Sequence, residues 1–168
     1  MVTQTANPLH SVKSAEWYTP EEYVEAARAT LGGIDLDPAS CEYANRTVNA
    51  TQYFTKDDHT FDEPWCGRVF LNPPKGLVGD FWEKLVSEWL AKNTTAAVWV
   101  GYSLEQLQVL QKFEWSPLDF PICFTKKRIR FVSPEGNKQS PTHSNYIAYL
   151  GPDPRKFRVA FEGFGRVL

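Results

Sequence analysis

Apolar residues recur every three or four positions in two stretches of the chain, residues 80–90 and 104–113. This spacing places them on one face of a helix, so each stretch is predicted to be helical. A third helix is predicted to begin at Thr19-Pro20-Glu21-Glu22, since threonine is a preferred N-cap, proline suits the first helical position and acids complement the helix dipole. Gly32-Gly33 is predicted to end it. Residues 39–50 are compatible with a short helix or irregular structure.

Short β-prone runs separate and follow these helices. They are residues 34–38, 51–54, 68–71, 96–100, 122–132, 144–150 and 157–161. Strands and helices alternate at first, and three strand-like runs then follow one another. This order predicts an α/β fold whose mixed sheet has antiparallel C-terminal strands. We expect a flexible lead-in over residues 1–15 and a single domain over residues 16–168.

The composition is that of a globular protein, with 42% hydrophobic and 14% aromatic residues. No apolar run approaches the ~20 residues of a membrane span, and residues 1–13 have no apolar core of a signal peptide. The three cysteines are far apart, which argues against a disulfide framework or a zinc ribbon. We therefore expect a cytoplasmic protein that does not act at a membrane. The scattered histidines form no metal-binding spacing, so no metal site is predicted.

Charge is distributed unevenly along the chain. Residues 1–110 carry 8 Lys and Arg against 15 Asp and Glu, whereas residues 111–168 carry 10 against 5. A basic C-terminal third is compatible with nucleic-acid binding and equally with an ordinary solvated surface. Within it, Lys126, Arg128 and Arg130 alternate, which predicts one face of a strand. That face would suit DNA phosphates, and its alternative role is to protect an edge strand by charge.

The tetrapeptide Asn72-Pro73-Pro74-Lys75 directly follows the apolar run Arg68-Val69-Phe70-Leu71. A proline stops a central strand, so the segment is predicted to be a buried strand that ends in a rigid turn. The Asn72 side chain and the Pro73 carbonyl both offer acceptors there. Ligands of open α/β sheets bind at the carboxyl ends of strands, so this turn is a candidate grip for an amino group. Its alternative is a capped turn with no ligand.

Four segments together resemble the phage-type DNA N6-adenine methyltransferases, a Dam-like family. They are Trp17-Tyr18-Thr19-Pro20, the stretch from Asp35 through Asp37-Pro38-Ala39-Ser40, Asp57-Asp58 and Asn72-Pro73-Pro74. The resemblance implies a compact Rossmann-like fold that uses S-adenosylmethionine to methylate adenine N6 in double-stranded DNA, within a bacterial host cytoplasm if the protein is phage-encoded. It implies that Asn72, Pro73 and Pro74 form the catalytic turn.

The resemblance also implies where the methyl donor binds. Asp35 and Asp37 would hold its amino group or ribose, and Asp57 or Asp58 would meet its adenine or ribose. Trp17 would form a wall of the site, while Thr19 and Pro20, at a helix start, would meet its carboxylate. Each has a structural alternative: turn carboxylates for the two acids of the strand, a solvated loop pair for Asp57 and Asp58, and a core anchor for Trp17.

Lys75 departs from the family pattern, in which an aromatic residue often follows the two prolines and stacks on the flipped base. A lysine cannot stack as a ring does, although it binds phosphate. Candidates for the missing ring are Trp65, Phe81, Trp82 and Phe131, each also a candidate core residue. One alternative function is therefore a catalytically degenerate fold that binds DNA or protein. Another is methylation of a different amine, in cytosine N4, RNA or protein.

Overall fold

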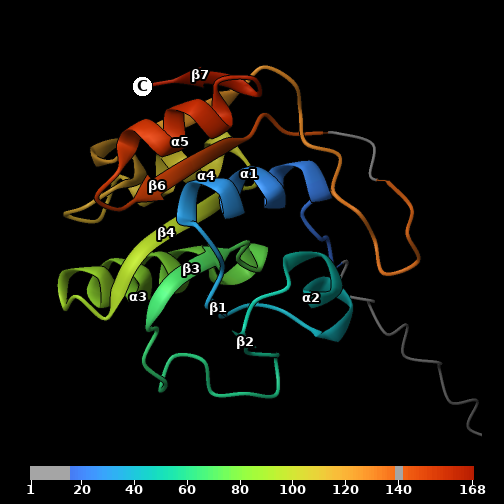
Figure 1. The fold of residues 1–168 in the computed structure, drawn as a ribbon, viewed down its shortest axis with the longest axis vertical. Coiled ribbons are helices and arrows are strands. Elements are labelled where there is room, and N and C mark those ends of the chain that lie inside the picture. The colour runs from blue at the N-terminus through green and yellow to red at the C-terminus, as the bar shows by residue number, and fades with distance from the viewer. Residues whose placement is uncertain (1–15, 139–141) are drawn as a thin grey trace, which may run out of the picture.

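Seven strands form one mixed sheet (Figure 1). The computed structural model describes residues 16–138 and 142–168, so the lead-in predicted for residues 1–15 lies outside the described residues. The sheet order is β2-β1-β3-β4-β6-β5-β7. The strands are β1 (Leu36–Asp37), β2 (Gln52–Tyr53), β3 (Gly67–Leu71), β4 (Thr94–Gly101), β5 (Ile122–Thr125), β6 (Tyr146–Leu150) and β7 (Gly165–Val167).

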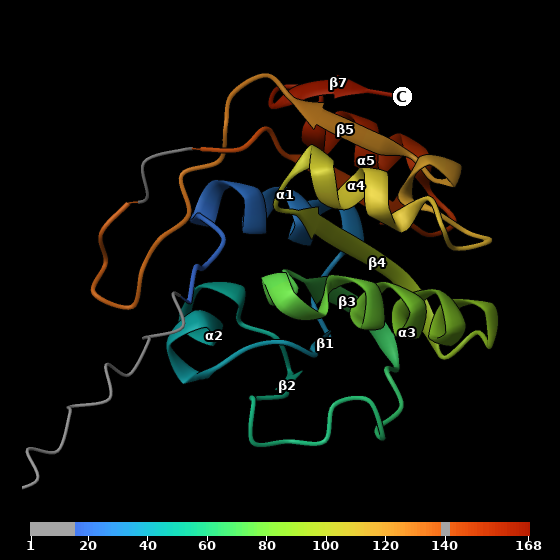
Figure 2. The ribbon, with the colours of Figure 1, turned by 180° about the vertical axis from the view of Figure 1, so that it is seen from behind.

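The first four strands are parallel and the last three join antiparallel neighbours. β1 pairs in parallel with β2 and β3, and β3 with β4, whereas β6 lies antiparallel between β4 and β5. β5 consequently runs in the direction of β4, as their arrowheads show in Figure 2. The carboxyl ends of β1 to β5 therefore meet at one edge, called here the carboxyl edge. The predicted α/β class and antiparallel C-terminal end are confirmed.

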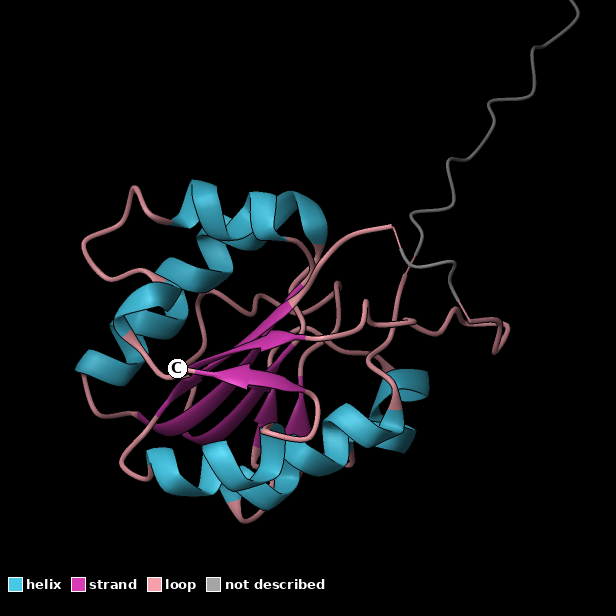
Figure 3. Ribbon diagram, turned by 90° about the horizontal axis from the view of Figure 1, so that it is seen from above, coloured by secondary structure: helices cyan, strands magenta, loops and turns pink. Residues whose placement is uncertain are grey.

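Helices cover both faces of the sheet, which Figure 3 shows in magenta between two cyan layers. On one face, α1 and α5 pack over Phe70, Val98 and Val100. On the other, α3 and α4 pack over Val69 and Trp99. Successive side chains of a strand point to opposite faces, so β3 and β4 feed both cores. The helices are α1 (Glu21–Leu31), α2 (Glu42–Val48), α3 (Val78–Leu90), α4 (Leu104–Leu110) and α5 (Pro154–Phe161).

The strand predicted for residues 157–161 is wrong, because this segment lies in α5. The Asp153 side chain accepts a hydrogen bond from the Lys156 amide at 3.2 Å and caps the helix, and Pro154 occupies its first turn. Phe157 and Phe161 are both fully buried. Their separation of four residues puts them on one helix face, a spacing that suits a helix rather than a strand.

The strand predicted for residues 122–132 is correct only as far as Thr125, where β5 ends. Beyond it the chain still alternates, with Ile129 and Phe131 buried and Arg128 and Arg130 exposed. The segment makes no ladder with β6, because Asn145 takes the place of a strand partner and its Oδ1 accepts from the Ile129 amide at 2.7 Å. Alternating apolar and polar residues show which side chains are buried, but a β-strand also requires hydrogen bonds to a neighbouring strand.

Helix α1 begins one residue later than predicted. Pro20 occupies the N-cap position and no side chain caps the helix, so the prediction of Thr19 as N-cap is wrong. The glycine end is confirmed, since Gly32 adopts φ 78° and its amide donates to the Arg28 carbonyl. No helix in the described ranges has the length and apolar character needed to cross a bilayer.

Candidate functional site

Asn72 lies at the carboxyl edge, directly after β3, and its side chain is anchored on one side. Its Nδ2 donates to the main-chain carbonyl of Trp17 at 3.0 Å. This bond fixes the amide so that Oδ1 is presented away from Trp17, and no described residue donates a hydrogen bond to that oxygen. Pro73 is buried behind it. The structure thus joins two of the predicted segments, 55 residues apart in the chain, through one hydrogen bond.

Trp17 serves the core as well as the site, because its side chain packs against the α1 and α5 core while its carbonyl holds Asn72. Thr19 follows at the start of α1. It is 6% exposed, and its Oγ1 is buried without a hydrogen-bond partner among the described residues. A buried hydroxyl without a hydrogen-bond partner is costly for stability.

Asp37 ends β1 at the carboxyl edge and is 3% exposed. Its Oδ1 accepts from the Ala39 amide at 3.2 Å. Burial raises the pKa of the Asp37 carboxyl to about 7, although hydrogen bonds from the Ala39 amide and the Ser40 hydroxyl act to lower it. Among the described residues no cation offsets this burial, so desolvation dominates the pKa of Asp37.

Asp35 does not share this setting. It precedes β1, at the amino edge, where its carboxylate accepts from Arg68 Nε at 2.8 Å and Arg68 Nη2 at 2.7 Å. Hydrogen bonds from Arg68 hold the pKa of the Asp35 carboxyl below its ordinary value. Arg68 also donates to the Gly32 carbonyl. Asp35 therefore does not lie beside Asp37 at the carboxyl edge, where the resemblance implies a shared role, because β1 begins only after it. Asp35 instead ties α1 to β3 through Arg68.

Asp57 and Asp58 lie exposed in the loop after β2, whose carboxyl end is at the same edge. The Asp58 carboxylate accepts from the Thr55 amide at 2.7 Å and from the Thr55 hydroxyl at 2.9 Å. These bonds lower the pKa of Asp58 and give it a role in shaping the loop. No described residue donates to the Asp57 carboxylate, so Asp57 is the more accessible acid of the two.

An aromatic ring from the end of a neighbouring strand lies beside Lys75. Lys75 places its Nζ 3.8 Å from the centroid of the Tyr102 ring, at the end of β4. Phe131, a predicted candidate, packs behind Tyr102 with a centroid distance of 5.6 Å and is 1% exposed. The other three candidates lie in the core on the α3 face: Trp65, Phe81 and Trp82.

Two residues of this edge, Tyr102 and Asn145, were not predicted from the sequence. Asn145 is 2% exposed, and its Nδ2 donates to the Tyr102 carbonyl. The Asn145 main-chain carbonyl accepts from the Thr125 amide. Asn145 therefore links the end of β4, through its side chain, to the end of β5, through its carbonyl. The available signal was a polar residue directly before the apolar run 146–150. Tyr102 gave no signal, since it reads as the last apolar residue of a strand.

The basic residues Lys126, Arg128 and Arg130 begin at the carboxyl edge, in a loop rather than on a strand. We call residues 126–130 the basic loop. The chain then reaches Tyr18, whose amide donates to the Val132 carbonyl at 2.8 Å and whose carbonyl accepts from the Val132 amide at 2.9 Å. Figure 2 shows this segment, in orange, running past the start of α1 toward α2. The basic loop therefore borders the edge that holds Asn72.

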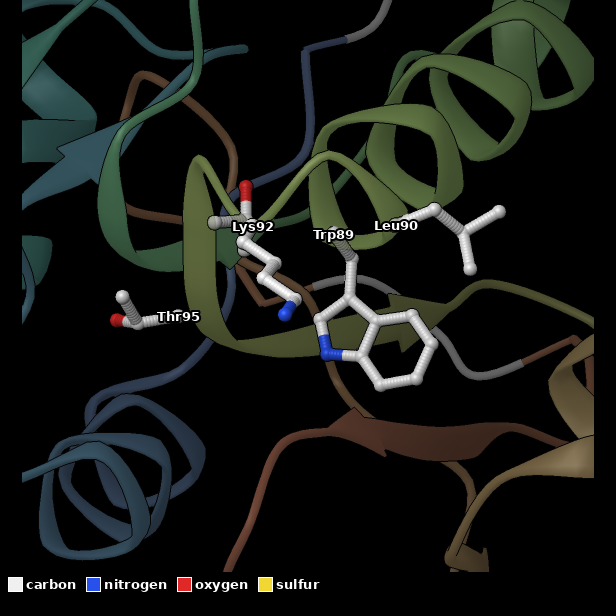
Figure 4. A pocket seen from close by; sticks show the side chains of 5 residues that line it. Trp89, Leu90, Lys92 and Thr95 are labelled. Carbon is white, nitrogen blue, oxygen red and sulfur yellow. The ribbon is translucent and has the colours of Figure 1, made fainter.

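Two pockets differ in their relation to this edge. One of about 430 Å³ lies between the end of α3 and the start of β4, lined by Trp89, Leu90, Lys92, Thr94 and Thr95 (Figure 4). It is at the amino edge and holds no predicted site residue. Another, of about 330 Å³, lies between α4 and the start of α3 and is lined in part by Lys75. The candidate site is assigned to the carboxyl edge because Asp37 ends β1 there and Asn72 follows β3 there, bonded to Trp17.

Comparison with known proteins adds no assignment to this geometry. The chain matches no known protein-family model, and no curated protein sequence is significantly similar to it.

Proposed function

We propose that this protein has a Rossmann-like methyltransferase fold and transfers a methyl group from S-adenosylmethionine to the N6 amine of adenine in DNA. The observation that carries the proposal is the anchored Asn72 amide. With Nδ2 bound to Trp17, Oδ1 is available to accept an N–H of the target amine. The Pro73 carbonyl would accept the other. Hydrogen bonds from both N–H groups to these acceptors would favour a pyramidal nitrogen, whose lone pair is less conjugated with the base and can attack the methyl group. The N–CH3 bond forms as the S–CH3 bond of the donor breaks, and one of the two hydrogen-bonded protons then leaves the nitrogen for solvent.

The residues around the turn fit the donor. S-adenosylmethionine, when bound, supplies an electrophilic methyl group on a sulfonium. The Thr19 hydroxyl, buried without a partner at the start of α1, would donate to its carboxylate. Asp37 would accept from its amino group or ribose hydroxyls, and Asp57 would reach its adenosine end from the loop after β2. Asp35 is not part of this proposal, because Arg68 engages its carboxylate at the other edge.

The acceptor is proposed to be DNA because of the basic loop. Lys126 and Arg130 are exposed on the basic loop, which borders the carboxyl edge. Cations there would hold DNA phosphates while a flipped base reaches Asn72. Phosphate contacts position the duplex without reading its sequence.

The proposal is tested by incubating the protein with labelled S-adenosylmethionine and duplex DNA of varied sequence, then digesting the product to nucleosides. We expect N6-methyladenosine in its deoxy form. Asn72→Ala should lower the rate by roughly 10²–10³-fold or more, because a preorganised acceptor is lost. Asn137→Ala, at an exposed asparagine in another loop, is the control.

Three results would contradict the proposal. Full activity of Asn72→Ala, with an unchanged melting temperature, would exclude the proposed turn. A modified cytosine, RNA or protein product would change the acceptor. No binding of S-adenosylmethionine by calorimetry would favour a binding module without catalysis.

A further inference from the structure

Asn145 lies at the base of a long connection between two neighbouring strands. β5 ends at Thr125 and β6 begins at Tyr146, and the two strands pair antiparallel. The main-chain carbonyl of Asn145 accepts from the Thr125 amide at 3.2 Å and from the Thr125 hydroxyl at 3.1 Å. These bonds hold together, at the carboxyl edge, the points where the chain leaves the sheet and returns to it.

The Asn145 side chain joins two other parts of the molecule. Its Nδ2 donates to the carbonyl of Tyr102, the first residue after β4, and its Oδ1 accepts from the Ile129 amide at 2.7 Å. Asn145 is 2% exposed, so both bonds are shielded from water. One partner requires a donor and the other an acceptor. Asparagine supplies both, whereas aspartate has no donor and leucine has neither.

Ile129 belongs to the basic loop, so Asn145 fixes the main chain that carries the basic residues. The Ile129 side chain is buried, and the neighbouring Arg130 is exposed. Beyond the loop, Val132 is held by two main-chain hydrogen bonds to Tyr18. The chain on either side of Arg130 is therefore anchored, while the Arg130 side chain is exposed to solvent.

The two anchors connect the basic loop to the candidate site. Tyr18 directly follows Trp17, whose carbonyl binds the Asn72 side chain. Asn145 binds the residue after β4, which lies beside β3 in the sheet, and Asn72 directly follows β3. Both routes lead from the basic loop to the strand end that carries Asn72.

We propose that Asn145 is a positioning residue, which holds the basic loop in register with the Asn72 turn. Phosphates bound by the loop would then place the target adenine at Asn72, while Asn145 itself contacts no DNA. A loop that takes the competent position only part of the time binds with an apparent affinity reduced by that fraction, and saturating DNA restores the rate. This inference rests on the proposed function and names how that site positions its DNA.

The test compares Asn145→Leu with the unmodified full-length protein on duplex DNA. DNA affinity is measured by fluorescence anisotropy, KM and kcat for DNA by methylation, and donor affinity by calorimetry. Leucine removes both side-chain bonds, so the dissociation constant and KM for DNA should rise roughly tenfold, whereas kcat and donor affinity should stay unchanged. Asn145→Asp keeps the acceptor for the Ile129 amide and should therefore restore most of the DNA affinity.

Thr94→Val is the matched control. Thr94 is also 2% exposed, and its hydroxyl donates to the Trp65 carbonyl at 2.7 Å, at the amino edge. Removing this buried bond should lower the melting temperature and leave the DNA affinity unchanged. Hydrogen exchange in the unmodified protein is a second measurement, which serves if Asn145→Leu fails to fold. The Ile129 amide, bonded to Asn145, should exchange slowly.

A folded Asn145→Leu protein with unchanged DNA affinity overturns the proposal. So does an equal loss of DNA affinity in Thr94→Val, which would reflect stability alone, or an Ile129 amide that exchanges as freely as in an unfolded chain. Methylation with a KM indifferent to Asn145→Leu refutes only the positioning role. DNA binding that depends on Asn145, without methylation or donor binding, refutes the methyl transfer and leaves the positioning role standing.

Discussion

The Thr19 hydroxyl and the Asp37 carboxyl are buried polar groups that the protein itself satisfies incompletely. Leaving such a group without a full set of partners costs about 1–3 kcal/mol. Both lie at the carboxyl edge, within the segments that the sequence analysis selected. At the scale of single residues, the candidate site is therefore marked by a cost in stability that a bound polar ligand would remove.

For Thr19 this reasoning predicts opposite effects on stability and on binding. Thr19→Val keeps the shape and removes the hydroxyl, so the free protein should gain up to about 1 kcal/mol in unfolding free energy. Affinity for S-adenosylmethionine should fall. Urea denaturation and calorimetry measure the two effects. A variant that loses stability and keeps its donor affinity would show that the hydroxyl has a structural partner instead.

For Asp37 the raised pKa predicts an unusual dependence of stability on pH. Between about pH 4 and pH 7 the folded state holds a proton that the unfolded state has lost, so the contribution of Asp37 to stability falls as pH rises across this window. The change is on the order of a few kcal/mol. Asp37→Asn should remove this pH dependence, so its unfolding free energy should differ less between pH 5 and pH 8 than that of the unmodified protein. Equal differences in both proteins would contradict the burial argument.

At the scale of elements, short capping and anchoring contacts decide what the periodic pattern leaves open. Asn145 ends β5 by occupying the place of a strand partner, and Arg68 joins the end of α1 to β1 and β3 through Asp35 and Gly32. Gly67 adopts φ 84°, and a Cβ there would lie 2.6 Å from the Asp35 carboxylate. The start of β3 is thus fitted closely around this ion pair.

The N-cap of α5 offers a direct test at this scale. Asp153→Ala removes the side-chain acceptor for the Lys156 amide and should lower the unfolding free energy by about 1 kcal/mol. Asp153→Ser should restore most of it, because serine caps as well. Denaturant titration of the three proteins gives the comparison. No loss in Asp153→Ala would mean that burial of Phe157 and Phe161 alone holds the helix.

At the scale of the whole molecule, segments from three parts of the chain enclose the carboxyl edge. The main chain of Tyr18 pairs with Val132, and the Tyr18 ring lies 5.1 Å from that of Tyr43 in α2. The segment that begins with the basic loop is therefore joined through Tyr18 to the start of α1 and to α2. DNA bound by the basic loop would lie beside the Asn72 turn.

This arrangement predicts how DNA affinity depends on salt. The double variant Lys126→Gln and Arg130→Gln should weaken binding for all sequences and reduce the slope of log affinity against log salt by roughly 2. Fluorescence anisotropy at several salt concentrations measures both. The charge-matched control changes Lys92 and Lys112, exposed lysines outside the basic loop, and should keep the slope. Equal slopes in both double variants would mean that DNA binds elsewhere.

The sequence by itself determined the α/β class, the antiparallel end and the strand that stops at Asn72. These follow from periodicity and from proline, which act over a few residues. Only the tertiary structure decided that Asp37 belongs to the carboxyl edge and Asp35 to the opposite one, since the exact start of a two-residue strand depends on its neighbours in the sheet. It also decided that Trp17 anchors Asn72 and that Tyr102 meets Lys75. Such contacts join residues tens of positions apart, and no local pattern encodes which strand ends come together.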